Sequence, residues 1–249
     1  MKKNLLIALT AVLMLGLLAA CANQDDDTLV VATDAAFPPF EYVDEESKEI
    51  VGFDIDLMDA IAEEAGLNIV YQNVGWDPLL AGMADCQYDM AISAMTITPE
   101  RAEQFSFSDP YINAGQIVVV PIDNDTIAGP EDLVGATVGA QIATTGAMEV
   151  EAIEDTTLKT YDTYELAFLD LANGQTDAVV ADYPTAMAFV NKNADTLKAV
   201  GDVFTDESYG IAFCMGNDEL IAQVNEALAT VQAEGLIDEL VLEWYGSAE

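Results

Sequence analysis

Short apolar runs alternate with amphipathic stretches from residue 28 to the end of the chain. The run at 28–33 (TLVVAT) predicts a strand, and 53–67 carries apolar residues at helical spacing before Gly66, which is placed to end a helix. The alternation continues with predicted strands at 68–74, 89–95, 136–140, 177–182 and 209–213, and with predicted helices at 77–87, 146–153, 163–173 and 217–245. This order is typical of an α/β fold with a largely parallel sheet.

The loops that follow these strands are where a site is expected, because ligands of such sheets bind outside the carboxyl ends of the strands. Those loops carry polar and aromatic residues: Asp34, Phe37, Thr96, Thr98, Arg101, Gln141, Thr144, Thr145 and Tyr183, with Asp182 at a strand end and Trp76 at a helix start. A cation, anions, hydroxyls and aromatic faces together suit a small zwitterion with an apolar or planar part.

The charge of the chain excludes some partners. Its 249 residues include 45 acidic and seven basic residues and no histidine, so the formal net charge is −38. Such a chain cannot neutralise phosphates, which argues against nucleic acid and against electrostatic docking on anionic lipid. Because 52% of the residues are hydrophobic, the chain can still bury a core, and the acidity predicts a solvated surface.

The first 21 residues have the composition of an export signal, with a basic start (MKKN), an apolar run (LLIALTAVLMLGLL) and then LAAC. That tetrapeptide resembles a bacterial lipobox, whose cysteine is lipidated and becomes the new N-terminus. An uncleaved membrane helix is the alternative, but the apolar run is short for a full span. We therefore expect a lipoprotein signal peptide at 1–20, a lipid on Cys21 and a tether at 21–27, which anchor the protein at the extracytoplasmic face of the bacterial membrane.

Two further cysteines, Cys86 and Cys214, would remain in the mature chain. Exported proteins form disulfides, so these two thiols permit one bond. They equally permit two buried free thiols, and the sequence does not choose between the alternatives.

Four segments resemble a known family: VVATDAAFPPFEY, VGFDIDLMDAIAEEAGL, YDMAISAMTITPERAEQFSFSDPY and YGIAF with the helices after it. They are similar to the polar amino-acid receptors of ABC importers, the glutamine and lysine–arginine–ornithine-binding group of the family 3 extracellular solute-binding proteins. The resemblance covers 28–247 in order. It implies a type II periplasmic-binding-protein-like fold, in which two α/β lobes joined by a two-segment hinge close on one ligand. Lobe 1 would comprise 28–112 and 207–249, and lobe 2 would comprise 113–206, with the chain crossing near 111–115 and 204–208.

Arg101, the only arginine of the chain, lies in the segment TITPER. The resemblance implies that it binds the ligand α-carboxylate, for which a planar group with two parallel donors is well suited. Thr98 is predicted as the N-cap and Pro99 as the first residue of a short helix, which places Arg101 near free backbone N–H groups. The alternative is a surface arginine paired with Glu100 or Glu103.

The resemblance assigns further residues to the ligand α-groups. Thr96 would meet both the carboxylate and the ammonium, and the Ala94 carbonyl and the Asp182 carboxylate would accept from the ammonium. The alternative for Asp182 is a helix N-cap, since DYP can start a helix. Lobe 2 would also contribute Thr144, through its backbone N–H to the carboxylate, and beside it Thr145 and Gln141.

The ligand side chain is expected to meet three lobe 1 residues. Phe37 and Trp76 would sandwich it, although ordinary core packing is the alternative for both. Asp34 would meet its polar or cationic end, which favours an uncharged polar or a basic amino acid over glutamate. Relatives carry lysine or histidine where this chain has Ala140 and Ala181, so the ligand need not be that of the glutamine receptor.

These features predict a monomeric substrate-binding lipoprotein of an ABC amino-acid importer, which delivers a polar or basic L-amino acid to a membrane permease. No cofactor, metal, nucleic acid or catalytic residue is expected, and the protein is not expected to be an enzyme. One alternative is a dehydratase of the same fold that acts on prephenate- or arogenate-like acids, but it would need a general acid or base. Another is an amino-acid sensor module, which usually continues into a transmembrane helix and a signalling domain.

Overall fold

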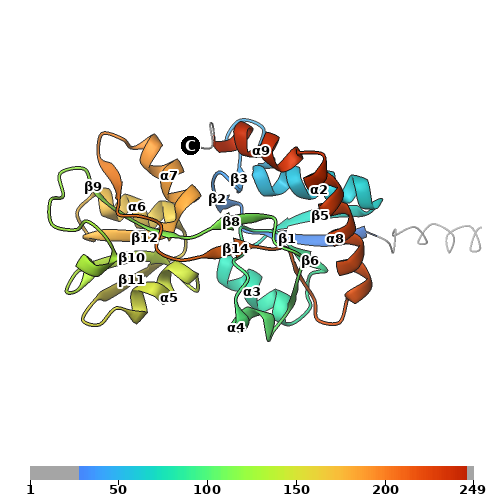
Figure 1. The fold of residues 1–249 in the computed structure, drawn as a ribbon, viewed down its shortest axis with the longest axis horizontal. Coiled ribbons are helices and arrows are strands. Elements are labelled where there is room, and N and C mark those ends of the chain that lie inside the picture. Colours follow the sequence, from blue (N-terminus) through green and yellow to red (C-terminus); the bar gives the residue numbers. More distant parts are fainter. Residues whose placement is uncertain (1–27, 246–249) are drawn as a thin grey trace, which may run out of the picture.

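The computed structural model describes residues 28–245 and places two sheets, each covered by helices, side by side along the long axis of the molecule (Figure 1). The predicted signal peptide, Cys21 and the tether lie outside the described residues. Between 28 and 245 no helix has the length and apolar character needed to cross a bilayer.

The first sheet has the strand order β5-β1-β6-β15-β7. Its strands are β1 (Thr28–Thr33), β5 (Asn68–Asn73), β6 (Met90–Ala91), β7 (Ser106–Phe107) and β15 (Ala212–Phe213). The helices around it are α2 (Phe53–Ala65), α3 (Trp76–Ala84), α4 (Pro99–Ala102), α8 (Asp218–Ala233) and α9 (Leu236–Tyr245). A small separate sheet of β2 (Ala36–Phe37), β3 (Glu41–Val43) and β4 (Ile50–Val51) leads into α2. We call this part of the molecule lobe 1.

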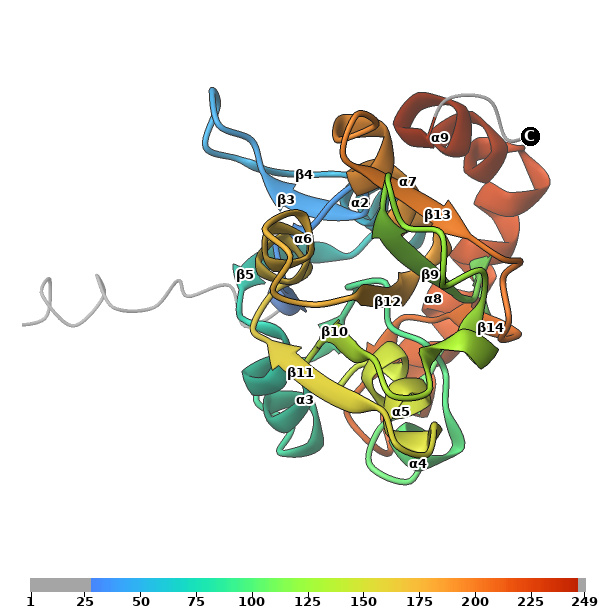
Figure 2. The ribbon, with the colours of Figure 1, turned by 90° about the vertical axis from the view of Figure 1, so that its left-hand side faces the viewer.

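The second sheet has the strand order β11-β10-β12-β9-β13. Its strands are β9 (Gln116–Pro121), β10 (Thr137–Gln141), β11 (Thr157–Tyr161), β12 (Ala178–Asp182) and β13 (Leu197–Val200). Its helices are α5 (Thr145–Ala152), α6 (Tyr164–Ala172), α7 (Tyr183–Lys192) and the short 3-10 helix η1 (Pro130–Leu133). Figure 2, in which this part faces the viewer, shows α6 and α7 on one side of the sheet and α5 on the other. We call this part lobe 2.

Two strands connect the lobes. β8 (Ile112–Ala114) and β14 (Glu207–Tyr209) pair antiparallel with each other and run between the two large sheets (Figure 1). This arrangement confirms the predicted α/β fold of two lobes joined by a two-segment hinge.

The expectation of a largely parallel sheet is wrong for half of the strand pairings in the two large sheets. In lobe 1, β1 pairs parallel with β5 and β6, whereas β15 pairs antiparallel with β6 and β7. Lobe 2 repeats this pattern, with β10 parallel to β11 and β12, and β9 antiparallel to β12 and β13. The antiparallel strands β15 and β9 follow directly from the hinge strands, so no crossover helix reverses the chain before they enter their sheets.

Two predicted strands are shorter than expected. The strand predicted at 89–95 ends at Ala91, and the chain then turns at Ala94, which adopts a left-handed backbone (φ 45°) and whose N–H donates to Asp54 Oδ2 at 2.7 Å. The strand predicted at 209–213 is divided between the end of β14 and β15. By contrast, α2 ends where predicted, with Gly66 in the left-handed C-cap conformation.

A disulfide joins Cys86 and Cys214, which decides between the alternatives that the sequence left open. The two residues are 128 positions apart in the sequence, and their Cα atoms are 5.0 Å apart. The bond ties the loop after α3 to the chain that follows β15. It therefore links the first and the last segments of lobe 1, and closing so long a loop is expected to stabilise the lobe by about 5 kcal/mol.

An aromatic core supports the pocket side of lobe 1. Phe40 is fully buried and its ring contacts the rings of Phe53 (5.8 Å between centroids) and Tyr209 (5.1 Å). Gly52 allows this close packing, because a Cβ atom there would lie 2.1 Å from the carbonyl oxygen of Phe40. The β2–β3 hairpin is thereby held against α2, which fixes the position of Phe37 and Glu41.

Candidate functional site

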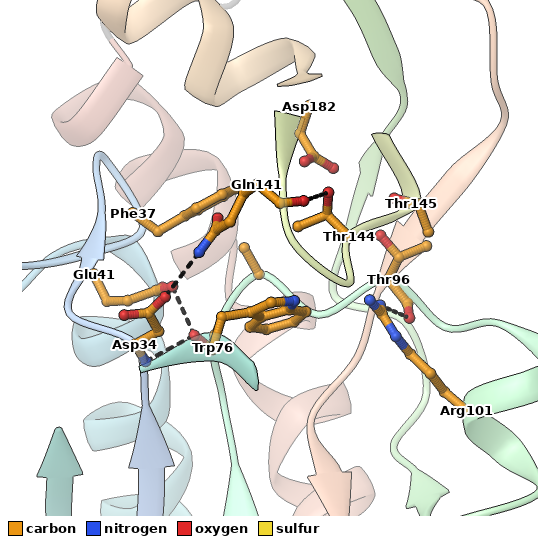
Figure 3. Close-up of a pocket in the computed structure, with 12 residues that line it drawn as sticks. Asp34, Phe37, Glu41, Trp76, Thr96, Arg101, Gln141, Thr144, Thr145 and Asp182 are labelled. Atoms are coloured by element: carbon orange, nitrogen blue, oxygen red, sulfur yellow. Dashed lines mark hydrogen bonds between the residues drawn. The ribbon is translucent and has the colours of Figure 1, made fainter. Parts of the chain in front are cut away.

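One pocket lies between the lobes and brings together all ten residues that the sequence predicted for the site (Figure 3). It also contains Glu41 and Ser93, which the sequence analysis did not name. Lobe 1 contributes Asp34, Phe37, Glu41, Trp76, Ser93, Ala94, Thr96 and Arg101, and lobe 2 contributes Gln141, Thr144, Thr145 and Asp182.

The strand ends position the polar side chains. Asp34 directly follows β1, Gln141 is the last residue of β10, and Asp182 is the last residue of β12. The residues of 93–101 follow β6. The carboxyl ends of the parallel strands in both lobes therefore face the same space, as the general rule for α/β sheets predicts.

Arg101 is buried, with 5% of its surface exposed. Thr98 is the N-cap of α4 and its Oγ1 accepts from the Arg101 N–H at 3.1 Å, with Pro99 as the first helical residue, as predicted. The Arg101 Nη1 donates to the Thr96 carbonyl at 2.8 Å, and Nη2 donates across the pocket to the Ala143 carbonyl of lobe 2 at 3.2 Å. The guanidinium thus points into the pocket rather than to the surface.

The environment of Arg101 keeps it charged while leaving it short of direct anionic partners. Burial lowers the pKa of Arg101, and the negative charges of Asp182, Glu207 and Glu100 act against that shift. A guanidinium starts from so high a pKa that it stays protonated near neutral pH. Its hydrogen-bond partners are carbonyl oxygens, and its Cζ lies 5.2 Å from the centre of the Trp76 ring.

Phe37 and Trp76 pack in the hydrophobic clusters of lobe 1 and also line the pocket, so core packing does not exclude the predicted contact with a ligand. Each is only 7% exposed. The Trp76 Nε1 donates to the Ala143 carbonyl at 3.2 Å, and the Phe37 ring lies 5.6 Å from that of Tyr164 in lobe 2. Both aromatic residues therefore contact the opposite lobe.

Asp34 and Glu41 form an acidic end of the pocket (Figure 3). The Ser93 hydroxyl accepts from the Asp34 N–H and donates to Glu41 Oε1, both at 2.9 Å. From lobe 2, Gln141 Nε2 donates to Asp34 Oδ2 at 3.1 Å. Burial raises the pKa of Asp34 to about 6, and the hydrogen bond from Gln141 acts in the opposite direction.

A third acid, Asp54, lies behind this end of the pocket and is fully buried. Its Oδ2 accepts from the Ala94 N–H at 2.7 Å and from the Tyr111 hydroxyl at 2.9 Å, so it holds the turn after β6. Burial raises the pKa of Asp54 to about 6, and burial together with the charges of Asp54 and Asp34 raises the pKa of Glu41. Three carboxyl groups are therefore concentrated on this wall.

A hairpin pattern was the signal by which the sequence could have revealed Glu41. Phe37 and Glu41 are directly opposite each other in the β2–β3 pair, joined by the turn that contains Pro38 and Pro39. Cross-strand partners share one face, so a pocket role for Phe37 implies one for Glu41.

Asp182 is at the N-cap position of α7, but its side chain forms no capping hydrogen bond, so capping does not account for it. It is 4% exposed, and its Oδ1 accepts from Gln116 Nε2 at 3.1 Å. Burial and the negative charge of Glu207 raise the pKa of Asp182 to about 7, while Arg101 acts to lower it. A cationic ligand group beside Asp182 would favour its charged form.

The side chains of Thr144 and Thr145 are already engaged. Thr144 is the N-cap of α5, where its Oγ1 accepts from the Ala147 N–H at 3.2 Å and donates to the Gln141 carbonyl at 2.8 Å. Thr145 Oγ1 donates to Glu207 Oε2 at 2.8 Å. Glu207, on the hinge, is another residue that the sequence analysis missed.

The sequence of residues 29–247 matches that of a known family, the bacterial extracellular solute-binding proteins, family 3. L-cystine-binding protein TcyJ of Escherichia coli K12 is 30% identical over 226 residues, which are 90% of this chain and 85% of that protein. ABC transporter arginine-binding protein 1 of the same strain is 33% identical over 252 residues, which are 98% and 99% of the two chains.

A solved structure shows the same fold. The arginine-, lysine-, histidine-binding protein ArtJ from the thermophilic bacterium Geobacillus stearothermophilus superposes with a TM-score of 0.83 at 40% identity, over 88% of this chain and 96% of that one. The match to the family over nearly all of the described residues, the identity to its relatives and this shared fold agree. The chain belongs to the bacterial extracellular solute-binding proteins of family 3.

Proposed function

We propose that the protein binds one free basic L-amino acid between its lobes and delivers it, chemically unchanged, to the permease of an ABC importer. The observation that carries the proposal is the charge pattern of the pocket. The pocket is lined by one buried guanidinium, that of Arg101, by one carboxylate of lobe 2, that of Asp182, and by two carboxyl groups at the acidic end, those of Asp34 and Glu41. This pattern is complementary to a molecule with one carboxylate and two cationic groups.

The two α-groups of the amino acid are assigned to opposite sides of the pocket. Arg101 binds the α-carboxylate through paired N–H donors, supported by the backbone N–H of Thr144. Asp182 pairs with the α-ammonium, and the Ala94 carbonyl accepts from it as well. Each charged group of the ligand then has an oppositely charged partner, which a buried charge requires.

The side chain of the ligand is assigned to the acidic end. It passes between Phe37 and Trp76, and its cationic tip meets Asp34 and Glu41. Glu41 narrows the ligand class beyond the uncharged polar or basic amino acids that the sequence alone suggested, because a second buried carboxyl group favours a cation over a neutral amide. Relatives known as an arginine-binding protein and as an arginine-, lysine-, histidine-binding protein are consistent with this choice.

Binding is coupled to closure of the lobes. Three hydrogen bonds already cross the pocket, from Arg101 and Trp76 to the Ala143 carbonyl and from Gln141 to Asp34. We propose that 28–112 with 207–249, and 113–206, move as two bodies about β8 and β14. A ligand that touches both bodies binds the closed form more tightly than the open one, and this difference shifts the population.

A dehydratase activity is less well supported than binding. The chain contains no histidine, and each buried carboxyl group of the pocket is assigned to a charged group of the ligand or to a structural contact. A general acid or base would need a group that is free to exchange a proton with the substrate.

The first prediction concerns selectivity and closure. Calorimetry should show binding of L-arginine, L-lysine or L-ornithine, weaker binding of L-glutamine and no binding of L-glutamate, because a second buried carboxylate would face Asp34 and Glu41. Small-angle X-ray scattering should show compaction with the bound amino acids only, and product analysis should show the ligand unchanged. Tightest binding to glutamate, or binding without compaction, would contradict the proposal.

The second prediction concerns Arg101. Arg101→Ala should weaken binding by about 2–5 kcal/mol, because the ligand carboxylate is left buried and unpaired. Arg101→Lys should recover only part of the loss, since the fork geometry is absent. Lys48→Ala removes a positive charge from the exposed surface of lobe 1 and is the control. A change smaller than about 1 kcal/mol in Arg101→Ala would show that Arg101 is not the carboxylate-binding residue.

The third prediction concerns pH. With the pKa of Asp34 at about 6, part of the protein must release a proton before this carboxylate can pair with a cation. Asp182, which pairs with the α-ammonium, has a pKa of about 7 and must also be charged. Affinity for L-arginine should therefore rise by more than about tenfold between pH 5 and pH 7 and level off only above about pH 8. Asp34→Asn should bind more weakly and with a flatter profile. Affinity that falls as pH increases over this range would have the wrong sign for the proposed pairing.

The fourth prediction concerns the anchor. We propose that Cys21 is lipidated, which holds the pocket close to the permease at the extracytoplasmic face of the membrane. Cys21→Ala should release soluble protein or leave an unprocessed precursor. Mass spectrometry of the native membrane protein should show a lipid on Cys21, and an intact Met1 would argue against processing.

A further inference from the structure

Glu207 lies on the hinge strand β14, and hydroxyl groups from three segments donate to its carboxylate. Thr96 of lobe 1 and Thr145 of lobe 2 both donate to Oε2 at 2.8 Å. Thr205, also in the hinge region, donates to Oε1 at 2.7 Å. Through Thr96 and Thr145 this one side chain is hydrogen-bonded to both walls of the pocket.

The chemistry of these contacts sets the direction of each hydroxyl proton. An ionised carboxylate can only accept hydrogen bonds, so each threonine must use its single proton as the donor to Glu207. The hydroxyl oxygens of Thr96 and Thr145 can then only accept from any other group. Thr145 Oγ1 already accepts from Gln116 Nε2 at 3.1 Å, and the same amide donates to Asp182 Oδ1.

The charges around these hydroxyls favour a cation. The negative charge of Glu207 raises the pKa of Asp182, so the two carboxylates lie close enough to repel each other. Arg101 is the cation beside them, and its Nη1 donates to the Thr96 carbonyl at 2.8 Å. Two carboxylates and two acceptor hydroxyls thus lie in a region with one guanidinium, which has no direct bond to either carboxylate, and a second cationic group there would balance the charge.

We propose that Glu207 is a positioning residue for the α-ammonium subsite: it orients the hydroxyls of Thr96 and Thr145 as acceptors beside Asp182. This inference rests on the proposed amino-acid binding and deepens it. Thr96 then contacts the ammonium and does not donate to the carboxylate, whereas the family resemblance had suggested contact with both α-groups. Because Glu207 is bonded to both lobes, the subsite is complete only when the lobes are closed.

The experiment compares two ligands that differ only in the ammonium group, L-arginine and 5-guanidinopentanoate, in calorimetric or competition binding assays. In Glu207→Gln the amide retains the size of the side chain but can donate a hydrogen bond to a threonine hydroxyl. That threonine then accepts from the amide, and its own hydroxyl proton can point toward the ligand ammonium instead of toward residue 207. Affinity for L-arginine should fall by more than about tenfold, while affinity for 5-guanidinopentanoate should change by less than about threefold. Asp206→Asn removes the same charge from the exposed neighbouring position and should leave both affinities unchanged.

The outcomes separate this inference from the function on which it rests. Equal losses for the two ligands in Glu207→Gln would show a merely structural role and overturn the assignment. Wild-type protein that binds no basic amino acid would contradict the proposed function itself. Should Glu207→Gln fail to fold, Glu207→Asp serves as the second variant, because it withdraws the carboxylate by one methylene. It should also lose affinity for L-arginine selectively, and an unchanged ratio of the two affinities would overturn the inference.

Discussion

The burial of one guanidinium in a strongly acidic protein is the constraint around which the pocket is organised. Arg101 is held by α4, which begins at the Thr98 cap, and its N–H groups reach the carbonyls of Thr96 and Ala143. Burying a cation is costly unless its donors are satisfied and an anion is near. Here the direct partners are neutral carbonyls, so a ligand carboxylate offers the guanidinium its strongest available partner.

Among the described residues, the acidic end of the pocket lacks a cation, just as Arg101 lacks a directly bonded anion, and several carboxyl groups are buried there close to one another. Desolvation raises the pKa values of Asp34 and Asp54, and for Glu41 the neighbouring acids add to this effect. Such an arrangement lowers the stability of the charged protein and is common where a site is adapted to a ligand. In the proposed function, a cation that enters this end would relieve the repulsion, so part of the cost of burying these acids would be recovered in binding.

The hinge strands join the two lobes, and one of their side chains is hydrogen-bonded to residues on both sides of the pocket. β8 and β14 form the only strand pair between the large sheets in the described part of the chain, and Glu207 on β14 is hydrogen-bonded to both lobes. In the proposed function, the residues assigned to the α-groups and those assigned to the side chain come together only when the lobes are closed. Ligand affinity and lobe closure would then depend on the same contacts.

The sequence by itself determined the local elements and the residues at their ends. Helical spacing and Gly66 predicted α2, and the pair Thr98 and Pro99 predicted the start of α4. The strand-end rule led to nine of the residues that line the pocket, the family resemblance added Ala94, and Thr98 and Tyr183, which the rule also named, do not line it. Only the tertiary structure decided the mixed sheets, the Cys86–Cys214 bond and the places of Glu41 and Glu207 in the site. Those features depend on where the chain returns after long excursions, 128 residues in the case of the disulfide, and local patterns of polarity carry no information about such contacts.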